Sequence, residues 1–438
     1  MTKNQPMKKI LLIILFILNT TIGNSTIINI PNDYSTIQQG IDYATVGDTI
    51  LVQPGTYIEN LNITKNITLA SLFLTTKDTS FIPQTIIDGN QQGSSIKISS
   101  LDSVIKEPVI CGFTVINGNG SLTVEDLYGT IYYGGGILCI YPNPDLNDIV
   151  KPTLQNLIIE NNYTESGGGI ACLNASPQII DVTIRNNTAS ADNIAHPLNQ
   201  AKGGGLFCIN HSNPSLKNVT ITGNIASSNS YGEPQNGGGI ACKDSSDVTL
   251  INSTISNNQV IGPSGYWGSY GGGIFCTQSF LTLKNVEISI NTTSSGWGNG
   301  IYLVQSNAEL TNLTMVDNFS YNHHYGLFIH GNGNYVSITN SIIYGHTNSI
   351  FFLYSYDTLD VSFSDIEYGE TGIVKYDCSP IINWLNGNLD EDPLFSGLED
   401  NPYQLSAESP CIDTGNPDTT GLNIPNDDLL GNVRIWDG

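Results

Sequence analysis

The sequence predicts an all-β protein built as a single-stranded right-handed parallel β-helix, with three short strands per coil and a short N-terminal capping helix. A Gly-Gly-Gly-aliphatic segment recurs every 33 to 36 residues in the middle of the chain, and Asn residues recur in register with it. Because units of this length cannot bury a core alone, we expect them to stack as coils about 4.8 Å apart. The five segments begin at Gly134, Gly167, Gly203, Gly237 and Gly271.

Residues 1–25 have the pattern of a signal peptide. Lys8 and Lys9 precede an apolar run over residues 10–18, which has the length of a signal-peptide core but only about half the length that spans a bilayer. Gly23 and Ser25 are small residues suited to cleavage. We therefore expect a secreted, extracellular or cell-surface protein with no transmembrane segment in its mature chain.

Residues 26–388 are expected to form the solenoid, with the most regular repeats over about 110–370. Near its start, Ser35-Thr36-Ile37-Gln38 has the pattern of a capping box that opens a short helix over about 35–45. Ile37, Ile41 and Ala44 share one face of this helix. Such a helix would cover the open end of the solenoid, which otherwise exposes an unpaired strand edge.

Two columns of polar residues mark the turns of each coil. Asn and Gly tolerate the left-handed backbone conformation that such turns need. We also expect each Asn side chain to bond to the one above and the one below it. One column is Asn156, Asp181, Asn218, Asn252, Asn285, Asn312 and Asn340, and the other is Asn162, Asn187, Asn224, Asn258, Asn291 and Asn318.

Five cysteines follow the Gly-Gly-Gly-aliphatic segments at a fixed offset, which places them on one face of the strands. We interpret them as small core residues, because Leu303 and Ile329 continue the same column. Vertical disulfides and a metal site are the alternatives, although the long spacing lacks a zinc signature. Cys378 and Cys411 are the better candidates for a disulfide. The column is Cys139, Cys172, Cys208, Cys242 and Cys276.

The N-terminal segment resembles a known superfamily. Tyr34-Ser35-Thr36-Ile37-Gln38, Asp48-Thr49-Ile50 and Gly55-Thr56-Tyr57-Ile58-Glu59 resemble the opening of pectin methylesterases and of the wider pectin-lyase-like superfamily. The resemblance covers about thirty residues and implies the fold alone, because the later esterase motifs have no matching positions. The Gly-Gly-Gly-Ile repeats over 134–326 also look loosely like those of polymorphic outer-membrane adhesins.

Residues 389–438 form an acidic C-terminal module. Asp392-Pro393-Leu394-Phe395 and Ser409-Pro410-Cys411-Ile412-Asp413-Thr414-Gly415 resemble the C-terminal module of bacterial anchor-associated β-helix proteins. That module usually continues further, so the resemblance implies a truncated module here. Its many acids make calcium a possible ligand, but their spacing matches no twelve-residue calcium loop, and no other cofactor is expected.

The formal net charge of −24 limits the classes of partner. Nucleic acid is not expected, because phosphate backbones are held by clusters of Lys and Arg, and the chain has only two arginines, Arg185 and Arg434. A polyanionic polysaccharide is a poor ligand for the same reason. A neutral polysaccharide or surface glycan remains compatible with the charge.

An aromatic stripe is the strongest candidate for a ligand site. The residue between the two inward positions of each first strand becomes aromatic along the chain, and further aromatics lie just before the Gly clusters. Such rings could stack on sugars. Alternatively, the loops fold over the strands and the aromatics pack on one another. The candidate ligand-binding residues are Phe207, Phe275, Tyr302, Phe328, Trp267, Tyr270, Trp297 and Tyr325.

Catalytic residues are not evident. The Gly-Gly-Gly-aliphatic strands carry no carboxylate pair of the kind that a glycosidase uses. Lys243 and His330 are the only first-strand candidates for the base of a lyase, and we place them three coils apart. His323, His324 and His330 are more consistent with polar surface residues than with a metal site.

These observations favour a secreted or cell-surface protein with a non-enzymatic binding or adhesive role, and glycans are the favoured ligands. The alternative is a polysaccharide lyase or glycoside hydrolase of the pectin-lyase-like superfamily. Burial of Phe207, Phe275, Tyr302 and Phe328 under the loops would instead remove the platform and favour a structural spacer.

Overall fold

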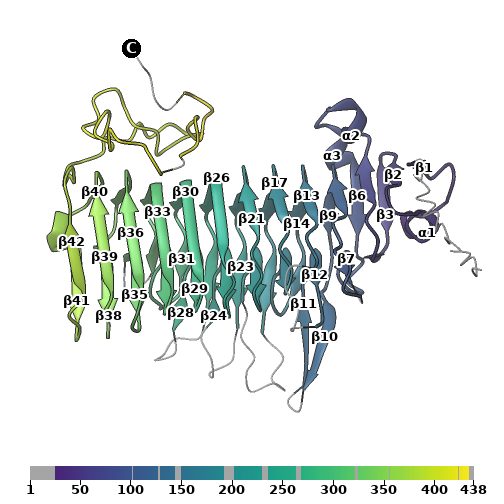
Figure 1. The fold of residues 1–438 in the computed structure, drawn as a ribbon, viewed down its shortest axis with the longest axis horizontal. Helices are drawn as coiled ribbons and strands as arrows, with labels where there is room; N and C mark the ends of the chain where they lie inside the picture. Colours follow the sequence, from purple (N-terminus) through teal and green to yellow (C-terminus); the bar gives the residue numbers. More distant parts are fainter. Residues whose placement is uncertain are drawn as a thin grey trace, which may run out of the picture.

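The computed structural model describes residues 25–433, except for 101, 127–128, 144–148, 192–201, 229–234, 263–267, 321–323, 355 and 423. In this part of the chain, short parallel strands stack coil upon coil along one axis (Figure 1). The predicted all-β parallel β-helix is therefore confirmed. Except for Ser25, the predicted signal peptide lies outside the described residues. Among the helices described, none combines the length and apolar character needed to cross a bilayer.

One sheet contains the first strand of each coil, and we call it the first-strand sheet. Its strands are parallel and in register, so that Cys139 lies beside Cys172 and Cys172 beside Cys208. The sheet consists of β4 (Leu61–Ile63), β7 (Ile96–Ser99), β12 (Ile137–Ile140), β16 (Ile170–Leu173), β20 (Leu206–Ile209), β25 (Ile240–Lys243), β29 (Ile274–Thr277), β32 (Ile301–Val304), β35 (Tyr325–His330), β38 (Asn348–Leu353) and β41 (Ile373–Tyr376).

The second and third strands of the coils form one long sheet, because they are continuous in some coils. It consists of β1 (Ile27–Ile30), β2 (Thr49–Val52), β3 (Gly55–Ile58), β5 (Thr68–Ser71), β6 (Thr85–Asp88), β8 (Val109–Cys111), β9 (Thr114–Ile116), β13 (Thr153–Gln155), β14 (Ile158–Glu160), β17 (Gln178–Ile180), β18 (Thr183–Arg185), β21 (Ser215–Lys217), β22 (Thr220–Thr222), β26 (Val248–Ser256), β30 (Phe280–Ser289), β33 (Asn307–Val316), β36 (Tyr335–Thr339), β37 (Ile342–Tyr344), β39 (Thr358–Ser362), β40 (Asp365–Ile366) and β42 (Ile381–Trp384).

The middle coils add a fourth short strand, which refines the expectation of three per coil. These strands form a sheet of β15 (Tyr163–Thr164), β19 (Thr188–Ser190), β23 (Ile225–Ser227), β27 (Gln259–Ile261), β31 (Thr292–Thr293) and β34 (Phe319–Ser320). A parallel pair, β24 (Gln235–Asn236) and β28 (Ser269–Tyr270), and an antiparallel hairpin, β10 (Ser121–Asp126) and β11 (Gly129–Tyr133), lie just before first strands.

Helices are short and lie in the N-terminal and C-terminal coils. They are α1 (Ile37–Tyr43), α2 (Phe73–Thr76), α3 (Phe81–Gln84) and the 3-10 turn η1 (Gly369–Gly372). The predicted capping helix is α1, which begins after Thr36 rather than Ser35, because the Thr36 side chain accepts from the Gln39 amide at 3.2 Å. Ile37 and Ile41 enter the core, so α1 covers the N-terminal end of the solenoid (Figure 1).

Two of the three glycines in each cluster are needed for close approach between coils. At Gly237 the backbone is left-handed, with φ +67°, as expected for a turn. A Cβ at Gly238 would lie 2.5 Å from the carbonyl oxygen of Gly272 and 2.7 Å from the amide nitrogen of Gln259. A Cβ at Gly239 would lie 2.7 Å from the Gly273 oxygen. The backbones of neighbouring coils are therefore in direct contact at the Gly clusters.

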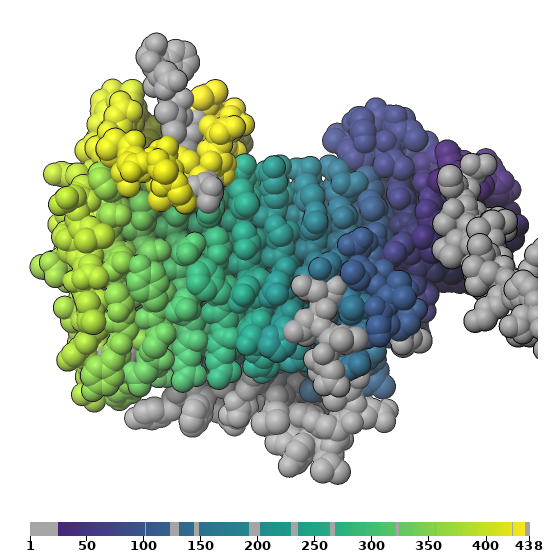
Figure 2. Space-filling view, in the orientation of Figure 1, coloured from purple at the N-terminus to yellow at the C-terminus, as the bar shows by residue number. Residues whose placement is uncertain are grey.

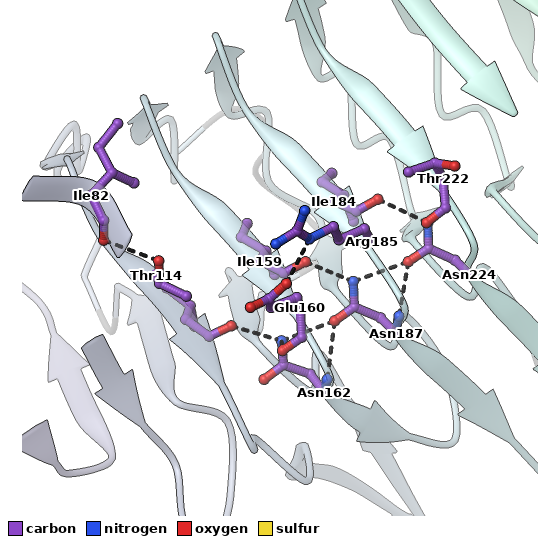
Figure 3. Close-up of polar contacts among 11 residues, drawn as sticks. Ile82, Thr114, Ile159, Glu160, Asn162, Ile184, Arg185, Asn187, Thr222 and Asn224 are labelled. Carbon is purple, nitrogen blue, oxygen red and sulfur yellow. Dashed lines mark hydrogen bonds and ion pairs between the residues drawn. The ribbon is translucent and has the colours of Figure 1, made fainter. Parts of the chain in front are cut away.

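The second Asn column forms the predicted ladder inside the solenoid. The Asn187 Oδ1 accepts both the backbone N–H and the Nδ2–H of Asn162, at 3.1 and 2.9 Å, and Asn224 does the same for Asn187 (Figure 3). Asn258, Asn291 and Asn318 repeat the pattern. Each amide thus supports its own turn and the turn of the preceding coil.

The other Asn column is less continuous. Its residues adopt the left-handed conformation, as at Asn218 with φ +55°. Side-chain hydrogen bonds join neighbours within this column, from Asn218 to Asp181 at 2.8 Å and from Asn285 to Asn252 at 2.9 Å. In this column, the left-handed backbone conformation explains the choice of Asn or Asp better than hydrogen bonding between the side chains does.

His346 ends the Asn ladder. It is buried, and its Nε2 accepts from the Asn318 amide at 3.3 Å. Nδ1 then carries the proton, and this buried nitrogen has no hydrogen-bond partner. Burial lowers the pKa of His346 from its ordinary value of 6.5 to about 3, and His324 adds to the effect.

We expect His346 to make folding sensitive to acid. Because its pKa is lower in the folded than in the unfolded protein, its contribution is complete above pH 6.5 and is lost progressively toward pH 3. The loss should be about 1.4 kcal/mol per pH unit. Urea unfolding of the wild type and of His346→Asn, from pH 7 to pH 4.5, measures it. The free-energy difference between the two proteins should change with this slope, and a constant difference would contradict the assignment.

All eight cysteines are free, and six of them are buried. Cys139, Cys172, Cys208, Cys242 and Cys276 belong to the apolar core, which agrees with the core interpretation. The predicted disulfide between Cys378 and Cys411 is absent from the structure. Cys378 follows the first-strand sheet and contacts the Phe352 carbonyl, whereas the Cys411 thiol lies 3.1 Å from Asp365 Oδ2 in the long sheet.

Alkylation of the native protein should distinguish the cysteines. Burial and the Asp365 carboxylate raise the pKa of the Cys411 thiol to about 12, so this cysteine should react slowly with iodoacetamide. Cys378 should therefore be labelled first, and the six buried cysteines only after unfolding. Mass spectrometry of timed samples checks the order. Early labelling of the buried column would show that the coils open readily.

The C-terminal module folds back over the long sheet (Figures 1 and 2). The Tyr403 hydroxyl donates to Asp317 Oδ2 at 3.0 Å, and the Asn416 amide donates to Asn340 Oδ1 at 2.8 Å. Lys284 Nζ donates to the Leu422 carbonyl at 3.1 Å. These contacts place the module on the long sheet and leave it away from the first-strand sheet.

Lys375 occupies an inward position at the C-terminal end of the first-strand sheet. It is the register partner of Phe352, whose side chain is in the core, but it is exposed because β41 is the last strand. An inward-pointing charge discourages the pairing of a further strand on an edge. The two ends of the solenoid are thus protected differently, by α1 at one end and by Lys375 at the other.

Candidate binding surface on the first-strand sheet

The outer face of the first-strand sheet carries two columns of side chains. The first column is the predicted stripe, which is in register from Leu138 through Ala171, Phe207, Ala241, Phe275, Tyr302 and Phe328. Register pairing extends it to Phe351, which was not among the predicted residues. The second column lies two residues later and includes Lys243, His330 and Tyr376.

The stripe is buried in the middle coils, which corrects the expectation of an exposed platform. Phe207 and Phe328 are 1% exposed, Tyr302 is 2% exposed and Phe275 is 9% exposed. The residues that precede the Gly clusters form a further column, which we call the cover column, and its aromatic members pack over the stripe. Its described aromatic members are Tyr133, Tyr270 and Trp297.

The aromatic rings form a continuous stack from Phe275 to Phe351, whereas Tyr133 and Phe207 stack as a separate pair beyond Ala241. Tyr270 stacks on Tyr302 with ring centroids 4.7 Å apart, and Trp297 stacks on Phe328 at 5.2 Å. Tyr325 lies 4.6 Å from Phe351. Offset stacking of this kind stabilises beyond the area that it buries. Phe207, Phe275, Tyr302 and Phe328 therefore pack against other aromatic residues, which was the alternative interpretation of the stripe.

Four aromatic residues at the edge of this stack remain half-buried, and we call them the rim. They pack against the stack, and part of each residue stays exposed. Ordered rings that stay partly exposed can contact an apolar sugar face without much loss of entropy on binding. The rim consists of Tyr270, Trp297, Tyr325 and Phe351. Trp267, which was also predicted, lies outside the described residues.

One polar pair lies within the stack. The Tyr302 hydroxyl and His330 Nδ1 are 3.0 Å apart. Burial raises the pKa of Tyr302 well above its ordinary value. Burial also lowers the pKa of His330, although the nearby Asp357 carboxylate partly offsets this decrease. Asp357 is itself held by the Asn334 amide and side chain, both at 2.8 Å. Both members of the pair are therefore neutral near pH 7.

Other predicted chemistry is not assembled on this face. Lys243 is paired with Asp244 at 3.3 Å, and two first strands, β29 and β32, separate its strand from that of His330. His323 lies outside the described residues. Across the described ranges, no group of three or more His, Cys, Asp or Glu side chains is placed to hold a metal ion, in the C-terminal module or elsewhere. Arg185 is paired with Glu160 at 2.6 Å on the long sheet (Figure 3).

Exposed tyrosines appear in the last two coils. Tyr354, Tyr356 and Tyr376 are 53%, 76% and 57% exposed. They lie at the end of β41 or just after β38, where the repeat has shortened to 23 residues. A shorter repeat does not by itself expose the stripe, because Tyr302 and Phe328 follow steps of 27 and 26 residues and are still buried.

Comparison with known proteins supports the fold. Residues 130–319 match the family model described as a right handed beta helix region. The match covers the regular repeats, and it agrees with the coil stacking described above. No curated protein matches the chain.

Three solved structures are similar at low sequence identity. Tailspike protein 2 of Escherichia coli O157:H7 bacteriophage CAB120 has a TM-score of 0.42 and 14% identity over 78% of this chain. The chain spans 43% of that tailspike. The Azotobacter vinelandii mannuronan C-5 epimerase AlgE4 A-module has a TM-score of 0.41 and 11% identity, covering 81% of this chain and 95% of its own. The corresponding AlgE6 A-module gives 0.32 and 11%, covering 82% and 94%. These likenesses concern the fold alone.

Proposed function

We propose that the protein is a secreted or cell-surface β-helix protein that binds neutral glycans through the rim of the first-strand sheet without cleaving them. The observation that carries the proposal is the row of half-buried aromatics Tyr270, Trp297, Tyr325 and Phe351, each held by contact with neighbouring rings. This row replaces the buried stripe as the binding surface.

Charge supports a neutral ligand. The chain carries a net charge of −24, and an anionic polymer would be repelled unless local cations compensated. The outer positions of the first strands from β12 to β41 carry one Lys and one His, and no carboxylate. Sugar hydroxyls can pair with the polar tips of Tyr and Trp while the sugar C–H face lies on the rings.

A glycan array and a polysaccharide depolymerisation screen of residues 26–438 test this function. We expect binding to neutral glycans and no release of fragments. The variant Trp297→Asn should weaken binding about tenfold, since Asn236 occupies the same cover column two coils earlier. Tyr163→Thr, which removes an exposed tyrosine from β15 beside Thr188, is the matched control and should bind normally.

An enzyme remains the second candidate, because His330 is half-buried on this face and neutral near pH 7, as a general base must be. Release of fragments that stops in His330→Gln would establish it and would contradict the binding-only role. Absence of both binding and fragment release in the wild type would contradict both functions.

A further inference from the structure

The last coils carry three exposed tyrosines at the turn that follows the first strand. Tyr376 is the last residue of β41, Tyr354 directly follows β38, and Tyr356 lies two residues later. More than half of each side chain is exposed. Soluble proteins usually keep large aromatic groups more covered than this, and a cluster of exposed ones indicates a binding surface.

Tyr354 is in a backbone conformation that its residue type disfavours. Its φ is +49°, in the left-handed region, where a bulky side chain is strained. The equivalent turn position in the other coils has the same conformation, but it is occupied by Gly or by a residue with a polar side chain. These residues are Asn174, Asn210, Asp244, Gln278, Gln305, Gly331 and Asp377. A tyrosine in this column costs stability, and an outlier of this kind is a reason to look for a function of the side chain.

The rings are arranged as a corner. Tyr354 and Tyr376 have centroids 6.3 Å apart and planes at 80°, so one ring offers its face where the other offers its edge. The Tyr354 amide donates to the Tyr376 carbonyl at 3.3 Å, and the Tyr356 amide donates to Asn332 Oδ1 at 3.1 Å. These two hydrogen bonds hold the main chain at Tyr354, Tyr356 and Tyr376 before any ligand arrives, which lowers the entropy cost of binding.

The residues on either side of Tyr376 in the sequence carry opposite charges. Lys375 and Asp377 flank Tyr376 in the sequence, and both are exposed. A single cation next to an anion does not create a site for a polyanion. The corner suits a pyranose ring, which presents an apolar C–H face to one tyrosine and its edge to the other, with hydroxyls directed toward the phenol groups.

We propose that Tyr354, Tyr356 and Tyr376 form a separate subsite for a neutral pyranose unit, at the C-terminal end of the first-strand sheet. This inference rests on the proposed glycan-binding function and assigns it a second set of contacts beyond the rim. Phe351, which belongs to the rim, is on the same strand that leads into Tyr354. One glycan chain that follows the sheet would therefore meet the rim first and the corner next.

Affinity electrophoresis in gels that contain neutral β-glucan, mannan or xylan tests the subsite. The double variant Tyr354→Asn/Tyr376→Thr places residues of the neighbouring coils at both positions, since Asn174 and Thr277 are their equivalents. We expect retention to fall at least tenfold in apparent affinity, whereas Tyr163→Thr should be retained like the wild type. Thermal unfolding should show that Tyr354→Asn alone is at least as stable as the wild type.

The outcomes separate the two proposals. Equal retention of the wild type and the double variant, with loss in Trp297→Asn, would overturn the subsite and leave the rim function intact. No retention of the wild type in any of these gels, together with an empty glycan array, would overturn both. Loss in Tyr163→Thr as well would show that the effect is not specific to the corner and would overturn the subsite.

Discussion

Asn258→Ala is expected to destabilise the solenoid by about 3–5 kcal/mol, because several buried polar groups lose their partners at once. Asn258 Oδ1 accepts the backbone N–H and the Nδ2–H of Asn224, at 3.0 and 2.9 Å. Its own Nδ2 donates to the Ile221 carbonyl and to Asn291 Oδ1, both at 2.9 Å. All of these groups are buried, so solvent cannot replace the missing amide.

Urea unfolding of the wild type and the variant measures the loss. Asn383→Ala is the matched control, because Asn383 is exposed and its side chain bonds to Asp360 at the surface. The control should change the free energy of unfolding by less than about 0.5 kcal/mol. A similar small change for Asn258→Ala would mean that the ladder does not hold the coils together.

Gly238→Ala is expected to cost about 3 kcal/mol, at the upper end of the effects of overpacking. The added methyl group would meet the Gly272 oxygen at 2.5 Å and the Gln259 nitrogen at 2.7 Å. The Gly272 oxygen belongs to the backbone of the next coil, and the Gln259 nitrogen belongs to the backbone of the same coil. No side-chain rotation can therefore relieve the contact. The coils must separate at the Gly clusters, which weakens the hydrogen bonds between them.

Gly333→Ala separates this clash from backbone strain. Gly333 is left-handed, with φ +88°, but a Cβ added there would have nothing within 4 Å. The control should therefore cost only about 1 kcal/mol, the penalty of a side chain in this conformation. Differential scanning calorimetry compares the two variants. Equal losses would show that conformation, and not coil spacing, explains the Gly clusters.

The fold could be predicted because each coil repeats the same local chemistry. The Gly clusters, the cysteine column and the Asn ladder each fix one position of the coil, and all three agreed on the register. The function of the glycines was only partly evident, since the sequence suggests turns while Gly238 and Gly239 serve close packing between coils. Continuing the ladder by one more step would have reached His346.

The candidate binding surface was harder to predict for a physical reason. Whether Phe207 or Tyr302 is exposed depends on the path of the loop before each Gly cluster, and loops leave no periodic signal. The strand pattern correctly placed these residues on the outer face, but Tyr133 packs over Phe207 and Tyr270 packs over Tyr302, so both are buried. Tyr354 was missed because its turn column was not identified, although Asn174, Asn210 and Asp244 mark that column clearly.

The salt dependence of glycan binding tests whether aromatic contacts on the first-strand sheet hold a neutral glycan. Affinity for the strongest-binding glycan of the array is measured by isothermal titration at low and at high salt. Stacking on aromatic rings predicts an affinity that changes less than about twofold, because screening acts on charges. An affinity that falls steeply with salt, or binding restricted to anionic glycans, would contradict this mode of binding.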